Sequence, residues 1–197
     1  LIQQIESTTG VQKEIAISLS PAGSQVTVVQ KLTNHNLWTI EVAPWALTVM
    51  AAGGKAIIPQ EPYSPHPDIP DYPGQEIDQR FYLPVRTLVL WSYTNLADPR
   101  WEFTSKYLVL KQDPDAEKPQ KIGMSNKQNW GAYLREGHLF VKRNVYQQGA
   151  TYPDHGCTFE TFTNSSMLEL EGLGPLTKLP PDGSVTYREN WYLFDGV

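Results

Sequence analysis

The residues best suited to chemistry are glutamates placed among hydrophobic side chains in two strand-like runs late in the sequence. Thr158–Thr163 contains Glu160, and Met167–Leu173 contains Glu169 and Glu171. Successive side chains of a strand point to opposite faces, so these carboxylates gather on sheet faces. A carboxylate on a partly dry face has a raised pKa, as a general acid or base requires. We take Glu160 as the acid–base candidate and Glu171 as a ligand contact, although a solvated sheet face gives the same pattern.

Two histidines are candidate proton donors beside Glu160. His35 lies in an Asn-rich stretch at a strand boundary, and His155 comes shortly before Glu160. Histidine exchanges a proton near neutral pH because its unperturbed pKa is about 6.5. A plain turn histidine is the alternative for His35. The four histidines are too scattered to form a metal motif by spacing, and we expect no metal and no cofactor.

Four further residues are candidates for substrate binding. Trp45 and Trp130 offer aromatic faces on which a sugar ring can stack, and Arg100 offers a planar donor fork. Lys142 lies among bulky residues of a strand. Each has a structural alternative: core tryptophans, an Asp98–Arg100 pair that stabilises a loop, and a lysine that snorkels from the sheet edge.

Composition excludes several classes of function. The formal net charge is −5 and no Lys/Arg run occurs, which argues against nucleic acid and anionic membranes as partners. No apolar run approaches the roughly 20 residues of a membrane helix. Cys157 is the single cysteine, so an internal disulfide is impossible, and its apolar neighbours predict a buried structural thiol. A chain without disulfides is compatible with the cytosol, the periplasm and the outside of the cell.

The alternation of short strand-like runs with turn residues predicts an all-β, antiparallel sandwich. Helical periodicity is almost absent, and short β-rich runs alternate with turn signals such as Ser20-Pro-Ala-Gly and Pro180-Pro-Asp-Gly. The predicted strands are Glu14–Leu19, Gln25–Leu32, Leu37–Val42, Leu47–Met50, Ala56–Pro59, Thr87–Trp91, Lys106–Leu110, Lys121–Gly123, Trp130–Leu134, His138–Val145, Thr158–Thr163, Met167–Leu173 and Ser184–Phe194.

A proline-rich excursion at 59–84 interrupts this rhythm. Proline cannot donate to a strand ladder, so we expect a long surface segment, either a rim over a binding face or a wrap over an edge strand. No linker or internal repeat is visible, and we interpret 1–197 as one β-sandwich domain. The opening Leu-Ile-Gln-Gln, without Met, is expected of a chain cut from a longer one.

Several stretches together resemble the galactose mutarotase-like (aldose 1-epimerase) superfamily, in particular an uncharacterised bacterial branch. They are the segment 33–50 with Gly53-Gly54, Trp91-Ser-Tyr-Thr-Asn with Asp98-Pro-Arg-Trp, Leu139-Phe-Val-Lys-Arg, and Phe159-Glu-Thr-Phe-Thr-Asn closing on Glu189-Asn-Trp-Tyr-Leu-Phe. The resemblance covers most of the chain.

The resemblance implies a β-supersandwich that binds a sugar. In the family a glutamate is general base and a histidine general acid; Glu160 matches the first, and His35 loosely matches the second, without the family's following aromatic pair. The family's early arginine and first histidine belong to an N-terminal part that has no counterpart here. Two hypotheses follow: a carbohydrate-binding domain that acts on a sugar by acid–base chemistry, or a non-catalytic accessory or structural module of a larger protein.

Overall fold

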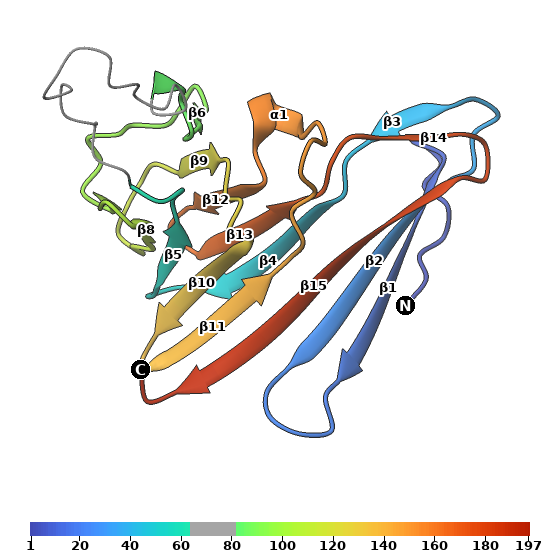
Figure 1. The fold of residues 1–197 in the computed structure, drawn as a ribbon. Helices are drawn as coiled ribbons and strands as arrows, with labels where there is room; N and C mark the ends of the chain where they lie inside the picture. The colour runs from blue at the N-terminus through green and yellow to red at the C-terminus, as the bar shows by residue number, and fades with distance from the viewer. Residues whose placement is uncertain (64–81) are drawn as a thin grey trace, which may run out of the picture.

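The computed structural model describes residues 1–63 and 82–197, and in them antiparallel strands form two stacked sheets. Most of the proline-rich excursion at 59–84 therefore lies outside the described residues. The prediction of an all-β antiparallel sandwich is confirmed (Figure 1). No helix of the described residues is long and apolar enough to cross a membrane.

The larger sheet has eight strands, in the order β1 (Val11–Leu19), β2 (Val26–Asn34), β15 (Ser184–Asp195), β11 (His138–Arg143), β10 (Trp130–Arg135), β5 (Lys55–Pro59), β8 (Tyr107–Lys111) and β7 (Trp101–Phe103). The second sheet has five, in the order β4 (Trp45–Ala51), β13 (Met167–Leu173), β12 (Phe159–Thr163), β9 (Gln120–Met124) and β6 (Leu88–Leu90). A two-stranded ribbon pairs β14 (Thr177–Leu179) with β3 (Ile40–Val42). The short helix α1 (Pro153–Gly156) leads into β12.

Each of the predicted strands contributes to a strand of the structure; Met167–Leu173 has the predicted bounds, and the others differ at one or both ends. One clear shift is at Leu37–Val42, where pairing begins only at Ile40 and Leu37 and Trp38 are exposed. The sequence reading missed β7 and β14, which have three residues each. Runs this short carry too little alternation to stand out from a loop.

The hydrophobic core fills the space between the two sheets. The five-stranded sheet contributes Ile122, Met124, Phe159, Leu168 and Leu170, and the eight-stranded sheet contributes Ala56, Ile58, Trp101, Leu108, Leu110 and Tyr133. The ring of Phe159 lies so close to Gly131 that a Cβ there would come within 2.2 Å of it. Because Phe159 points into the core, its neighbour Glu160 points to the other face of the five-stranded sheet.

The eight-stranded sheet is wider than its partner. Figure 1 shows β1 and β2 to the right of β4, the outermost strand of the five-stranded sheet. Ile15, Ile17 and Leu19 of β1 lie on the sheet face that carries the core residues, as their register through β2 and β15 shows. They are nevertheless exposed, because no described strand covers them.

Candidate functional site

The site is built on the face of the five-stranded sheet that points away from the core. The register places Glu160 of β12 beside Glu171 of β13 and Gly123 of β9, and places Lys121 of β9 beside Phe162. Residues paired in this way project from the same face of the sheet. Three neighbouring strands thus bring two carboxylates and one ammonium together.

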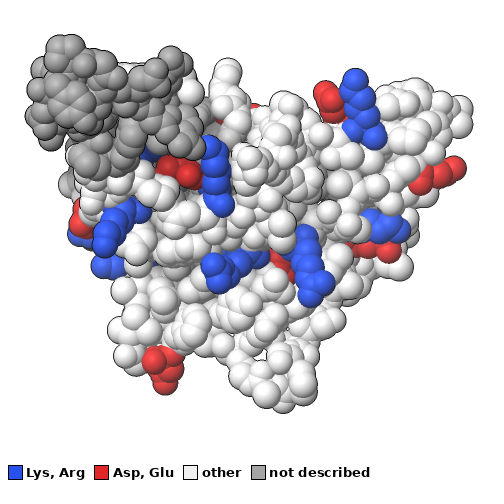
Figure 2. All heavy atoms as spheres, viewed as in Figure 1, with Lys and Arg blue, Asp and Glu red and all other residues white. Residues whose placement is uncertain are grey.

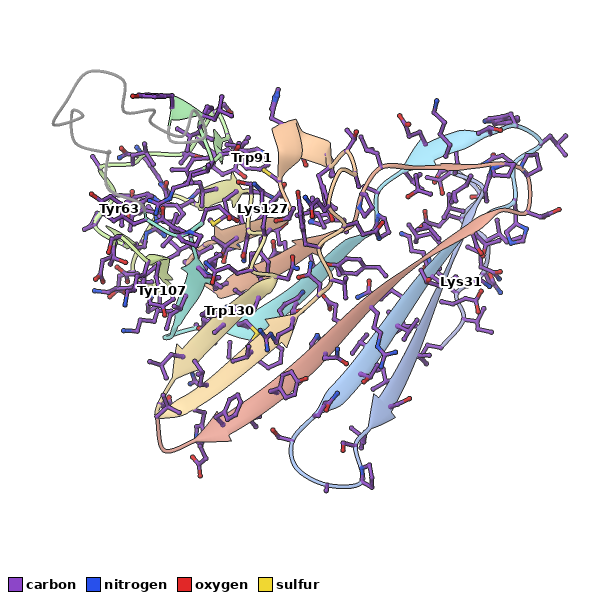
Figure 3. All side chains as sticks on the ribbon, viewed as in Figure 1. Lys31, Tyr63, Trp91, Tyr107, Lys127 and Trp130 are labelled. Atoms are coloured by element: carbon purple, nitrogen blue, oxygen red, sulfur yellow. The ribbon has the colours of Figure 1, made fainter. Side chains whose placement is uncertain are left out.

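Lys121 joins the two carboxylates. Its Nζ lies 2.8 Å from Glu160 Oε2 and 2.8 Å from Glu171 Oε2. The same nitrogen lies 5.0 Å from the ring centroid of Trp45 and 4.7 Å from that of Trp91. Cation–π attraction adds to the two ion pairs at such distances. We call Lys121, Glu160, Glu171, Trp45 and Trp91 the Lys121 cluster; Figure 3 labels Trp91 on the strand-to-turn segment beside β9.

In the Lys121 cluster the two carboxylates are buried and the ring of Trp45 is exposed. Glu160 is 1% exposed and Glu171 0%, and one oxygen of each, Oε1, accepts no hydrogen bond within the described residues. Trp45 is 54% exposed, although its indole Nε1 donates a 2.8 Å hydrogen bond to Glu171 Oε2. A buried anchor therefore fixes the orientation of an exposed aromatic ring.

Gly123 makes room for this arrangement. A Cβ at this position would lie 2.5 Å from Cys157 Sγ, 3.2 Å from Trp91 Cη2 and 3.3 Å from Glu160 Cγ. Any larger residue would displace one of these groups. The Cys157 thiol is buried as expected, and burial, with Glu160 nearby, raises its pKa to about 12. It is therefore a poor nucleophile.

The electrostatics of the cluster leave Glu160 able to exchange a proton. Burial raises the pKa of Glu160 to about 7; Lys121 opposes this effect, and Glu171 and Asp154 add to it. Burial alone would lower the pKa of Lys121, but its bonds to both carboxylates outweigh burial and raise it. The cluster therefore holds a cation beside a carboxyl group whose pKa lies near neutral pH.

The structure places the two candidate histidines differently. His35 lies at the end of β2, where its ring contacts Gln12 Oε1 at 3.3 Å and Asp182 Oδ1 at 3.6 Å, and it contacts no member of the Lys121 cluster. His155 is exposed on α1, directly upstream of Cys157 and β12, with φ of 59°. Its ring makes no hydrogen bond or ion pair within residues 1–63 and 82–197.

Arg100 and Lys142 do not line the cluster, and both have interior structural contacts instead. Arg100 makes a two-point contact with Asp98, Nε to Oδ1 at 2.9 Å and Nη2 to Oδ2 at 2.8 Å, which corresponds to the loop-stabilising alternative. Lys142 is 1% exposed, so the structural alternative of a lysine that snorkels from the sheet edge is wrong. Its Nζ lies 2.8 Å from Glu189 Oε1 between the two sheets.

Trp130 lies on the other side of the molecule. It belongs to β10 of the eight-stranded sheet, where its ring lies 6.1 Å from that of Tyr107 (Figure 3). Of the predicted site residues, the structure thus gathers Glu160, Glu171 and Trp45. Lys121 and Trp91 were missed as functional residues, because the sequence shows them only as members of predicted strands.

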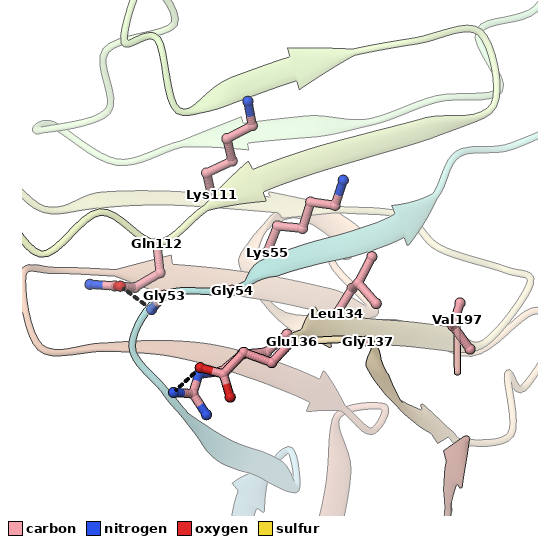
Figure 4. Close-up of a pocket in the computed structure, with 10 residues that line it drawn as sticks. Gly53, Gly54, Lys55, Lys111, Gln112, Leu134, Glu136, Gly137 and Val197 are labelled. Atoms are coloured by element: carbon pink, nitrogen blue, oxygen red, sulfur yellow. Dashed lines mark hydrogen bonds and ion pairs between the residues drawn. The ribbon is translucent and has the colours of Figure 1, made fainter. Parts of the chain in front are cut away.

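The described residues also form a polar hollow of about 360 Å³ at the turn of β10 and β11, apart from the Lys121 cluster (Figure 4). Gly53, Gly54 and Gly137 form part of its wall, and Gln112 Oε1 accepts the Gly53 N–H at 2.6 Å. Arg135 is paired with Glu136 at 2.8 Å. No predicted site residue lines this hollow. Among the described residues no group of three or more His, Cys, Asp or Glu side chains is arranged to hold a metal ion.

Comparison with solved structures identifies the architecture. An Escherichia coli K12 protein described as a "Putative aldose 1-epimerase" superposes with a TM-score of 0.60 at 11% identity, over 98% of this chain and 64% of that one. A galactose mutarotase-like protein from Lactobacillus casei ATCC 334 gives 0.51 at 11% identity, over 98% and 68%. A TPR-domain containing protein from Parabacteroides distasonis ATCC 8503 gives 0.54 at 12% identity, over 97% and 31%.

The chain has the galactose mutarotase-like fold. No family model matches the sequence, and no curated protein matches it either. The resemblance seen in the sequence is thus confirmed for the fold. The chain spans about two thirds or less of the length of these three structures. In this galactose mutarotase-like fold, the Lys121 cluster occupies the outward face of the smaller sheet.

Proposed function

We propose that the face of the five-stranded sheet around the Lys121 cluster binds a carbohydrate. The observation that carries this proposal is Trp45, an exposed indole ring whose N–H is tied to the buried Glu171. A sugar stacks its apolar C–H face on an aromatic ring, and a ring fixed beforehand loses little entropy on binding.

The surroundings of Trp45 suit a neutral, hydroxyl-rich ligand. Tyr93 is exposed and lies close enough to Lys121 and Glu171 for their charges to act on its hydroxyl. Glu169 lies on the same sheet face as Glu171, and burial raises the pKa of Glu169. Phenol and carboxyl groups supply acceptors and donors for sugar hydroxyls. The fold likeness to proteins described as aldose 1-epimerase or galactose mutarotase-like supports a sugar over other polar ligands.

The test is a titration of the chain with D-glucose, D-galactose, lactose and cellobiose, followed by calorimetry and by NMR of the tryptophan indole N–H signals. We expect at least one sugar to bind, and Trp45→Ala to weaken that binding about tenfold or more, because it removes the stacking surface. Trp38→Ala is the matched control, since Trp38 is 63% exposed on a different segment. If Trp45→Ala binds the sugar as well as the unaltered chain does, the site is elsewhere. If no sugar binds, the accessory or structural module is the better description.

A second candidate function is interconversion of sugar anomers, favoured by the raised pKa of Glu160, about 7. Ionised Glu160 would take the proton of the anomeric hydroxyl while the bond between C1 and the ring oxygen breaks. His155, exposed just before β12, would give a proton to that ring oxygen. The open-chain aldehyde then closes on either face, so the reaction is redox-neutral.

Polarimetry of freshly dissolved α-D-galactose and α-D-glucose tests this second function. We expect the chain to accelerate mutarotation over buffer, and Glu160→Gln to remove about a hundredfold or more of that rate, as loss of a general base does. Glu102→Gln, an exposed carboxylate on β7 of the other sheet, is the control. A rate equal to that of buffer for the unaltered chain would exclude this function and leave carbohydrate binding intact.

A further inference from the structure

A separate cavity of about 480 Å³ lies on the outer face of the eight-stranded sheet. It is lined by Trp130, Leu139, Val141, Arg143, Tyr192 and Phe194. Its volume is within the range of small-molecule sites, roughly 300–1,000 Å³. Because the core separates this face from the five-stranded sheet, the cavity is independent of the Lys121 cluster.

The register of three neighbouring strands assembles the lining. Val141 of β11 pairs with Tyr192 of β15, and Leu139 pairs with Phe194, so these four side chains share one face. Trp130 of β10 pairs with Arg143 of β11 on the same face. The rings of Tyr192 and Phe194 are stacked, with centroids 6.5 Å apart and planes 22° apart. The walls are therefore aliphatic and aromatic.

Arg143 is the one charged residue in the lining. It is exposed, and its guanidinium makes no hydrogen bond or ion pair in the part of the chain that the structure describes. No carboxylate lines the cavity to neutralise it. The indole N–H of Trp130 and the hydroxyl of Tyr192 are likewise without partners in the described residues. All of these groups can donate a hydrogen bond to a bound molecule.

The surroundings do not supply a counter-ion. In Figure 2 the surface over β10, β11 and β15 carries few charged side chains. Arg188, two residues from Asn190 on the same face of β15, adds a second cation without an ion pair among the described residues. An unpaired guanidinium beside aromatic walls favours a ligand that has both an anionic head and an apolar ring.

We propose that this cavity is a binding site for an aromatic carboxylate. The carboxylate accepts two parallel hydrogen bonds from the Arg143 guanidinium, and the ring lies against Trp130, Tyr192 and Phe194. An acidic sugar shares the carboxylate but has hydroxyls on every side, and Leu139 and Val141 offer them no partner. The aromatic body is therefore the better match to the walls.

The experiment compares 2-naphthoate with its neutral analogue 2-naphthylmethanol and with D-glucuronate, by calorimetry and by ligand-observed NMR at about neutral pH. We expect the affinity for 2-naphthoate to exceed that for the alcohol by about tenfold or more, because the alcohol lacks the carboxylate that pairs with the Arg143 guanidinium. Arg143→Gln should lower the affinity for 2-naphthoate to that for the alcohol. Lys111→Gln, which removes an exposed cation of β8 outside the lining, and Trp45→Ala, in the Lys121 cluster, should leave the affinity unchanged.

A second variant keeps the test independent of Arg143. Val141→Trp fills the cavity from the middle of its floor and should abolish binding of both naphthyl compounds while circular dichroism stays unchanged. The proposal is overturned if 2-naphthoate does not bind, if it binds no better than the alcohol, or if Arg143→Gln has no effect. Tighter binding of D-glucuronate than of 2-naphthoate would replace the aromatic ligand by an acidic sugar.

Discussion

Burial and the ion pair with Lys121 act in opposite directions on the pKa of Glu160. The Glu160 carboxyl is almost wholly removed from water, which raises its pKa, yet it lies 2.8 Å from an ammonium that lowers it. The balance is a pKa of about 7. In a typical exposed ion pair screening by water would leave the carboxyl fully ionised at this pH.

This balance predicts a pH dependence of stability. The folded-state pKa of Glu160 is about 7, above its ordinary value of 4.5, so the folded chain binds the extra proton between these values. The contribution of Glu160 to the free energy of unfolding is thus greatest below about pH 4.5 and falls as pH rises through 7, by on the order of 3 kcal/mol in all. Glu160→Gln, which is neutral at every pH, should lose this fall.

Urea denaturation of the chain and of Glu160→Gln between about pH 5 and 8 measures the effect. We expect the free energy of unfolding of the variant to rise relative to that of the unaltered chain as pH increases. Glu102→Gln serves as control, since Glu102 is exposed on β7. Parallel pH profiles for the chain and Glu160→Gln would contradict the raised pKa.

Residue types indicated part of the site in advance. Glu160 and Glu171 stand out as carboxylates in apolar runs, and Trp45 as an aromatic residue after Pro44. Lys121 could not be found in this way, because its role depends on β9 pairing with β12, which no local pattern fixes. A lysine in a strand with Ile122 and Met124 on the opposite face indicates only a polar face.

At the scale of elements, Lys142 connects the two sheets through the core. From β11 its Nζ reaches Glu189 of β15, and it donates to Ala46 O at 2.9 Å, Thr48 Oγ1 at 3.0 Å and Leu170 O at 3.1 Å on the facing sheet. Burial outweighs Glu189 and lowers the pKa of Lys142. Glu189 in turn accepts from Trp191 Nε1 at 3.1 Å.

Removing one partner of this buried pair should be costly. Lys142→Met leaves the Glu189 charge in the core without its cation, which typically costs about 3–5 kcal/mol of unfolding free energy. Adding Glu189→Gln to Lys142→Met removes that charge while keeping the acceptor for Trp191, and should restore a large part of the loss. Lys111→Met, on the exposed end of β8, should change stability by no more than about 0.5 kcal/mol.

Urea denaturation of the three variants at one pH gives the comparison. A double variant as unstable as Lys142→Met alone would mean that packing, and not the unpaired charge, causes the loss. The sequence could not show this pair: alternation places Lys142 on a face with Phe140, but its partner lies on β15, far along the chain.

At the scale of the whole molecule, the sequence predicted the fold class and nearly all strands, since alternation and turn residues are local signals. It did not predict which strands form which sheet. The order β2-β15-β11 joins segments from both halves of the chain, and only the packing of the finished core decides it. The sequence could not predict the cavity around Arg143 either, because its lining comes from β10, β11 and β15 and depends on how these strands pair.

The unequal width of the two sheets has a consequence for how tightly different strands are held. Strand β12 pairs with β13 on one side and with β9 on the other, and all of its side chains except that of Phe162 are buried. Strand β1 is kept in place chiefly by its ladder to β2, since Ile17 and Leu19 already face water in the native state. Separating β1 from β2 exposes little additional apolar surface. Transient opening at this edge of the sheet therefore costs far less free energy than opening at β12.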